Sequence, residues 1–270
     1  MIIEILAKLS SETLLSLYPI FVKNIGLPIS LQTWSRFFSY ALISVFFINY
    51  SFVYNTLFTY TGIILSFITI IHIYTSYRGF KLLDGGVAYS IFYLYPIMIL
   101  LMSGNKIQWY MFLALIGVYL LASNDLNNVH IDNNSEIIEG VIMILFAAFT
   151  EAIIYFLVRD IKTLNNWNHI FISYFFGAVL LSGWFMNDIS VMKLNSRISL
   201  SLLINAVIGL LGYLLRFYAV SRLDANIYAP LSYFGIVMSF IYGIFINGEY
   251  ISLKKIMGVI LIIISNYLLL

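Results

Sequence analysis

Residues 123–139 read SNDLNNVHIDNNSEIIE and form the longest polar stretch in a chain of 270 residues. The stretch contains four acidic residues and five asparagines, and it has no lysine or arginine. It lies almost at the midpoint of the chain, between two long apolar regions. We interpret residues 124–136 as a polar linker that separates a first half, residues 1–123, from a second half, residues 137–270.

The composition on either side of this linker excludes a water-soluble globule. Apolar residues make up 62% of the chain and charged residues 10%, whereas soluble proteins have roughly 45–50% and roughly 25%. So few charges cannot cover the surface of a soluble protein of this size. The composition therefore predicts an integral, multi-pass protein of the lipid bilayer, which we expect in the cell membrane.

Apolar runs between polar breaks predict ten transmembrane helices and hence an all-α membrane protein. The predicted segments are residues 2–22, 29–49, 57–78, 86–103, 107–122, 137–158, 168–187, 199–219, 227–246 and 252–270. At about 20 residues each they use about 200 residues, so no large domain outside the membrane fits. Five segments lie on each side of the linker.

Short matches between the two halves predict an internal repeat. Leu83-Asp84 matches Leu223-Asp224 at a shift of 140, and Glu12 matches Glu151 at a shift of 139. Because each half has five helices, an odd number, the second half would enter the membrane from the opposite face. The fold is therefore predicted to be two inverted five-helix repeats, an arrangement that recurs in transporters with a midplane binding site.

Four motifs lie within these segments. They are Arg36-Phe37-Phe38; Tyr89 followed by SIFYLYP at 90–96; Gly209-Leu210-Leu211-Gly212 followed by Arg216-Phe217-Tyr218-Ala219; and Gly248-Glu249 followed by Gly258. Together they resemble the drug/metabolite transporter superfamily, in particular its ten-helix EamA-like members. Two positions depart from the family pattern, since Gly104-Asn105 stands where Gly-Glu is usual and Gly235-Ile236 where a proline is expected. The resemblance implies transport of a small-molecule solute.

Two carboxylates within predicted spans are candidate substrate or proton sites. An ionisable group at the centre of a spanning helix costs about 2.5–3.5 kcal/mol, so it is functional by default. Glu151 has no basic residue three or four positions away, and it is either a proton or cation site or a carboxylate paired with a neighbouring helix. Glu12 is its repeat counterpart, although Lys8 lies one turn earlier and can pair with it. The chain is also similar to the small multidrug members of the superfamily, which implies cationic cargo and protons as the coupling ion.

Four further residues complete the candidate site. Arg216 can counter a carboxylate on the solute, pair with Glu151, or reach the lipid headgroups. The remaining candidates are three tyrosines on the fourth and ninth predicted helices, which line the cavity in the family: Tyr89, Tyr93 and Tyr233. They can stack on a cation or simply pack. Arg36 is expected to be an interface anchor or a structural pair, and His72 a packing residue.

The prediction is a secondary transporter that moves a small organic metabolite, such as an amine or amino acid, by alternating access. The rival classes are a membrane-embedded enzyme and a channel. The sequence contains no zinc-protease motif, nucleophile elbow or phosphate-binding loop, and it has no cysteine. We therefore expect no enzymatic activity, cofactor or metal. The net charge of +2 comes from thinly spread residues, so no nucleic acid is expected either. The sequence leaves open a monomer or a homodimer.

Overall fold

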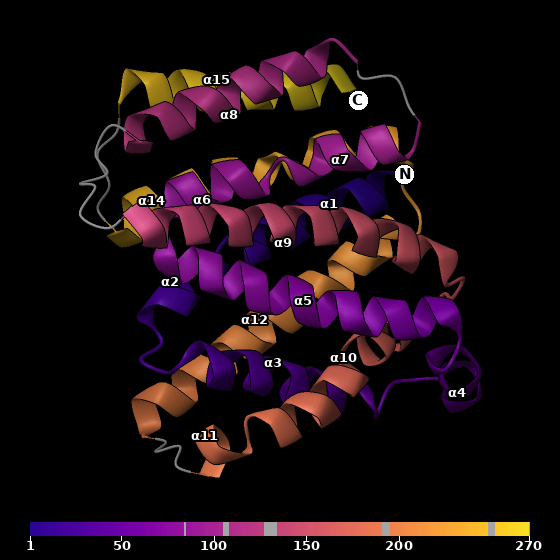
Figure 1. Ribbon diagram of the computed structural model, residues 1–270. Coiled ribbons are helices and arrows are strands. Elements are labelled where there is room, and N and C mark those ends of the chain that lie inside the picture. The colour runs from indigo at the N-terminus through magenta and orange to yellow at the C-terminus, as the bar shows by residue number, and fades with distance from the viewer. Residues whose placement is uncertain (84, 105–107, 127–133, 191–194, 248–251, 270) are drawn as a thin grey trace.

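The protein is built from α-helices throughout the part of the chain that the structure describes. This computed structural model describes residues 1–270 except 84, 105–107, 127–133, 191–194, 248–251 and 270. The helices are α1 (Ile2–Leu15), α2 (Tyr18–Asn24), α3 (Ile29–Ser44), α4 (Tyr50–Leu57), α5 (Tyr60–Leu82), α6 (Gly85–Phe92), α7 (Tyr95–Met102), α8 (Tyr110–Leu126), α9 (Asn134–Asp160), α10 (Asn166–Trp184), α11 (Met186–Ser190), α12 (Ser196–Val220), α13 (Ala225–Ser232), α14 (Phe234–Asn247) and α15 (Leu253–Leu269) (Figure 1).

Seven of the ten predicted segments correspond to one main helix each: α3, α5, α8, α9, α10, α12 and α15. The short helices α4 and α11 lie at the ends of predicted segments and were not predicted. Asn49 stabilises the start of α4, because its side chain accepts a hydrogen bond from the backbone N–H of Phe52. Residues 127–133 of the predicted linker lie outside the described residues. The division into two halves at residues 124–136 therefore stays a prediction.

The other three predicted segments are each broken into two helices, and each contains a proline. Pro19 and Pro96 lie in the first turn of α2 and α7, while Pro230 lies inside α13, just before α14 begins. Proline lacks a backbone N–H and cannot continue an existing helix without loss of a hydrogen bond. At each break the backbone forms a 3₁₀-type hydrogen bond between residues three apart. An example is the bond from the N–H of Leu94 to the carbonyl oxygen of Ile91. Tyr93 and Tyr233 lie at two of these breaks.

Four helix pairs make the most extensive contacts. Helix α5 packs along α9, α1 along α12, α3 along α10, and α8 along α15. In Figure 1, α8 and α15 lie together on one side of the molecule, and the broken helices α6 and α7 lie between them and α9. The broken helices also meet, since α7 contacts α13 and α6 contacts α14. Helices α1, α5, α9 and α12 therefore enclose the centre of the bundle, where the buried charges lie.

The described helices bury several charged side chains among apolar ones and also expose many large apolar side chains. On α9, Glu151 is 3% exposed, whereas Phe146 and Phe149 are 55% and 48% exposed. Large apolar surfaces of this kind face a partner or a membrane in stable proteins. By length and composition, five helical stretches among the described residues can cross a bilayer. They are Ile2–Asn24, Tyr60–Leu82, Ser135–Asp160, Ser196–Val220 and Ala225–Ile246.

Candidate functional site

A buried ion pair spans one turn of α1. Lys8 Nζ donates to Glu12 Oε1 at 2.5 Å, and neither side chain is exposed. The two residues face the same side because positions four apart lie one above the other on a helix. The ammonium group also lies 3.7 Å from the centroid of the Tyr228 ring. The ring face attracts the cation, and Lys8 also donates to the hydroxyl of Tyr95 at 3.4 Å, so it has three partners among the described residues.

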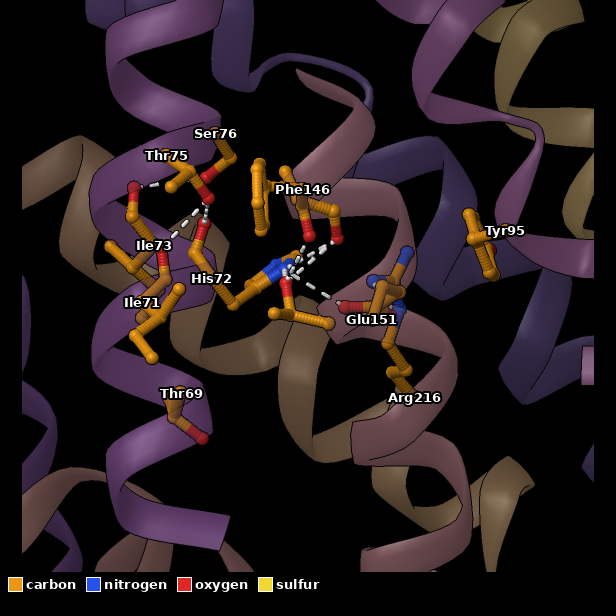
Figure 2. Close-up of polar contacts among 12 residues, drawn as sticks. Thr69, Ile71, His72, Ile73, Thr75, Ser76, Tyr95, Phe146, Glu151 and Arg216 are labelled. Carbon is orange, nitrogen blue, oxygen red and sulfur yellow. Dashed lines mark hydrogen bonds and ion pairs between the residues drawn. The ribbon is translucent and has the colours of Figure 1, made fainter. Parts of the chain in front are cut away.

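Arg216 on α12 joins Glu12 to a second carboxylate. Its Nη2 donates to Glu12 Oε1 at 3.1 Å, and its Nη1 donates to Glu151 Oε1 at 2.6 Å. Figure 2 shows Glu151 and Arg216 next to one another. All three side chains are buried. Charges removed from water are tolerated when they are paired and hydrogen-bonded, and Arg216 supplies this pairing between α1, α9 and α12.

His72 on α5 lies on the other side of Glu151 (Figure 2). Its Nδ1 is 3.0 Å from the carbonyl oxygen of Ala147 and 3.2 Å from Thr150 Oγ1. Its Nε2 is 3.2 Å from Glu151 Oε2. The ring is not aligned for a straight hydrogen bond, and Glu151 Oε2 has no hydrogen-bond partner among the described residues. One oxygen of Glu151 is thus paired with Arg216 and the other faces an imidazole.

The predicted tyrosines differ in how they meet this network. Tyr93 donates from its hydroxyl to Glu12 Oε2 at 2.9 Å. Tyr89 stacks on Tyr93 with 5.6 Å between ring centroids, and its hydroxyl donates to the carbonyl of Leu15. Tyr233 is fully buried 6.5 Å from Tyr93, ring to ring, and its hydroxyl has no partner among the described residues. Of these three tyrosines, only Tyr93 therefore contacts a charged group of the network.

Gly235 on α14 makes room for the contact between Tyr93 and Glu12. A Cβ atom at this position would collide with the hydroxyl of Tyr93 and would lie 2.8 Å from Glu12 Oε2. The residue occupies the place where the family resemblance leads us to expect a proline. A glycine here lets the phenol pass close to the helix backbone.

We expect Gly235→Ala to lower the free energy of unfolding by about 1–3 kcal/mol, which is typical of an overpacked core. The additional change Tyr93→Phe should recover part of the loss, because it removes the oxygen that collides with the new methyl group. Thermal unfolding of the purified variants measures both effects. Gly183→Ala on α10 is the matched control, since nothing lies near its Cβ position, and it should not be destabilised. Equal melting temperatures for all of these variants and the wild type would contradict the close approach.

A small cavity adjoins the network. Its lining includes Arg36, His72, Arg216, Tyr18, Tyr77 and Tyr213, with Tyr89 and Tyr93 at its wall. The cavity volume is about 30 Å³, which is enough for about two water molecules. The cavity is therefore too small for an organic metabolite in this conformation.

The six predicted site residues differ in whether they lie in the charged network, line the cavity or do neither. Glu12, Glu151 and Arg216 meet in one network, although they lie on three helices. Tyr93 bonds to that network, Tyr89 lines the cavity, and Tyr233 packs behind Tyr93 without lining it.

Sequence reasoning passed over three residues of the site. Lys8 was noted only as a partner for Glu12, His72 as a packing residue, and Arg36 as an anchor or structural pair. A signal was present in each case, because all three are ionisable residues inside predicted spans. No group of three or more histidine or acidic side chains arranged to hold a metal occurs among the described residues.

The second half of the chain matches a known family, the EamA-like transporter family, over residues 138–270. This half of the chain is EamA-like. Two proteins of Helicobacter pylori are 27% and 26% identical to this EamA-like chain over 165 residues. They come from strains J99 and 26695, and each is named "Uncharacterized transporter". Each match covers 58% of this chain and 52% of the relative. The match thus spans about half the length of these curated relatives.

A crystal structure shares the fold of the EamA-like chain, with a TM-score of 0.73 and 15% sequence identity. The similarity covers 97% of this chain and 94% of the other, and at this identity it shows the fold alone. The family match and the apolar helices indicate an integral, multi-pass membrane protein, and the curated relatives are named as transporters. The predicted superfamily membership is confirmed.

Proposed function

We propose that this EamA-like chain is a secondary carrier that moves a small organic metabolite, such as an amine or amino acid, across the cell membrane by alternating access. The observation that carries the proposal is the buried network of Glu12, Arg216 and Glu151. It connects helices from both predicted halves at the centre of the bundle. Ionisable groups held inside a membrane bundle typically mark a substrate or ion pathway.

The helix pairing supports two inverted repeats as the basis of this mechanism. If the first half is exchanged with the second, α1 takes the place of α9 and α12 takes the place of α5. The pair α1–α12 then corresponds to the pair α9–α5, and both are among the most extensive contacts. Glu12 and Glu151 correspond in the same way, as do Tyr93 and Tyr233. Rocking of one repeat against the other would open the shared site to alternate sides.

The contact between His72 and Glu151 supports coupling to protons. The carbonyl of Ala147 can only accept a hydrogen bond, so we assign the ring proton of a neutral His72 to Nδ1. Its Nε2 then faces Glu151 Oε2 at 3.2 Å, and two acceptors repel each other unless one of them carries a proton. A proton on Glu151 would remove its negative charge and weaken its pairing with Arg216. Protonation would thereby loosen α9 from α12.

The small cavity supports a cycle that passes through a closed state. Because the solute does not fit into about 30 Å³, the helices must separate for it to enter. The broken helices α1–α2, α6–α7 and α13–α14 provide points where such movement can be absorbed. Breaks of this kind near a midplane site are a recurrent feature of secondary transporters.

Solute exchange in sealed liposomes tests the proposal against a channel and an enzyme. Purified protein should show saturable exchange of a radiolabelled amino acid or amine, selected beforehand by thermal-shift screening of metabolites. A carrier exchanges solute without net current through an open pore. Conductance without saturation would identify a channel, and conversion of the solute without movement would identify an enzyme. Either result would refute the carrier.

A further inference from the structure

Arg36 lies in the middle of α3 and is a buried cation without a carboxylate partner. Its side chain is 4% exposed, and none of the ion pairs among the described residues includes it. The other buried cations, Lys8 and Arg216, are both paired with carboxylates. An isolated buried charge is strongly unfavourable. Arg36 therefore differs from every other buried cation that the structure describes.

The count of buried charges among the described residues gives the same result. Three cations, Lys8, Arg36 and Arg216, face two carboxylates, Glu12 and Glu151. The described interior, its imidazoles apart, thus carries one positive charge without a counterion. A ligand with a single negative charge would neutralise it.

Tyrosines surround the guanidinium but leave its Nε donor free among the described residues. Nη1 donates to the hydroxyl of Tyr77 at 3.2 Å, and Nη2 donates to the hydroxyl of Tyr174 at 3.0 Å. The Tyr213 hydroxyl is a third hydrogen-bond partner of the guanidinium. An arginine has five N–H donors, and Nε has no partner among the described residues. The rings of Tyr18 and Tyr213 lie 4.6 and 4.7 Å from the guanidinium carbon. Adjacent free N–H groups match the two oxygens of a carboxylate.

The tyrosine hydroxyls can also donate hydrogen bonds to an anion. Because the hydroxyls of Tyr77 and Tyr174 accept from Arg36, their own protons are available for donation. Tyr77 and Arg36 both line the central cavity, as do His72 and the aromatic rings of Phe80 and Phe92. The cavity thus joins a donor-rich, positively charged end to aromatic walls. Its volume of about 30 Å³ is of the size needed for a small polar group.

We propose that Arg36 binds the carboxylate of the transported solute, and that this solute is a small monocarboxylate with an apolar or aromatic remainder. This inference rests on the proposed carrier function and specifies the chemical class of the solute. It changes the expected cargo, because the sequence pattern favours a cation whereas the unpaired Arg36 favours an anionic group. A phosphate monoester carries about −1.5 to −2 at neutral pH, more than one cation neutralises, so the charge count favours a carboxylate over a phosphate monoester.

The rival explanation is that Arg36 is a structural cation held by the faces of Tyr18 and Tyr213. Under that explanation the guanidinium needs no ligand, and its removal weakens the bundle. Under the proposal, the ligand-free protein contains an unsatisfied charge, and replacement by an apolar side chain of similar length removes it. The two explanations therefore predict opposite effects of Arg36→Met on the ligand-free protein.

Thermal shifts of the full chain in detergent test the proposal with three aromatic probes. Benzoate carries a carboxylate, benzamide is its neutral counterpart, and benzylamine is a cation of similar size. At saturation benzoate should raise the wild-type melting temperature by about 3–6 °C, and the other two should not. Arg36→Met should abolish this shift, and Arg36→Lys should weaken binding about tenfold because the planar fork is lost. Arg222→Met, which removes an arginine outside the cavity lining, should keep the full benzoate shift.

Each result decides the question. A shift with benzylamine alone, no shift with benzoate, or a benzoate shift that persists in Arg36→Met would overturn the carboxylate site. A ligand-free Arg36→Met protein that melts clearly below the wild type would assign Arg36 the structural role and would also overturn it. Exchange in liposomes separates this inference from the proposed function. Benzoate binding without any exchange would refute the carrier alone, and exchange of an amine that persists in Arg36→Met would refute the carboxylate site alone.

Discussion

Replacement of Arg216 by methionine is expected to lower the free energy of unfolding by about 3–5 kcal/mol, the usual cost of removing one partner of a buried ion pair. Arg216 is the shared partner of Glu12 and Glu151. After its removal Glu12 keeps Lys8 and Tyr93, but Glu151 keeps only the imidazole of His72. Glu151 would then be a buried carboxylate without a cationic partner among the described residues. In a chain of this size the loss corresponds to a decrease in melting temperature on the order of 10 °C.

A second change should restore much of that loss. The double variant Arg216→Met with Glu151→Gln removes one charge of each sign, so the balance between Lys8 and Glu12 is kept. Comparison of the two single variants with the double variant isolates the coupling between Arg216 and Glu151. Arg222→Met serves as the control, because the half-buried Arg222 donates hydrogen bonds only to Tyr218 and Ser221 among the described residues. Additive losses in the double variant would show that the pair does not contribute to stability as a unit.

The helices could be predicted well because they depend on local runs of apolar residues. Each of the ten predicted segments coincides with one helix or with one pair of broken helices. A proline marks each of the three breaks in the helices: Pro19, Pro96 and Pro230. A hydropathy pattern does not take account of the effect of proline on the backbone. Short helices such as α4 depend on capping by a single side chain, Asn49, and an apolar pattern cannot reveal them.

The site could be predicted only in part because its contacts join helices that are distant in sequence. Glu12 and Glu151 could be found, since a carboxylate in a spanning helix is rare and the repeat relates the two. The approach of His72 to Glu151 could not be inferred, because it depends on how α5 packs along α9. Arg36 was the hardest case. Arg36 stands out because no carboxylate pairs with it among the described residues. A sequence does not show which side chains the neighbouring helices place beside it.

Glu151→Gln should abolish proton-driven accumulation of the solute while the protein remains folded. Glutamine has nearly the same shape, can still accept a hydrogen bond from Arg216, and cannot bind or release a proton. Arg216 retains Glu12 in this variant, so the network loses its titratable group without losing its central cation. In liposomes with an imposed pH gradient, the ratio of internal to external solute should fall to about one, because an uncoupled carrier only equilibrates its solute.

Glu139→Gln is the matched control for this experiment, since Glu139 lies on the same helix in a half-exposed pair with Arg78 and should keep full accumulation. Exchange of labelled for unlabelled solute without a gradient separates coupling from binding, and Glu151→Gln should retain it. If accumulation and its dependence on the pH gradient were unchanged in Glu151→Gln, Glu151 would have no part in coupling. The 3.2 Å approach of His72 to Glu151 would then be a packing contact between α5 and α9, and the coupling ion would have to act at Glu12 or elsewhere.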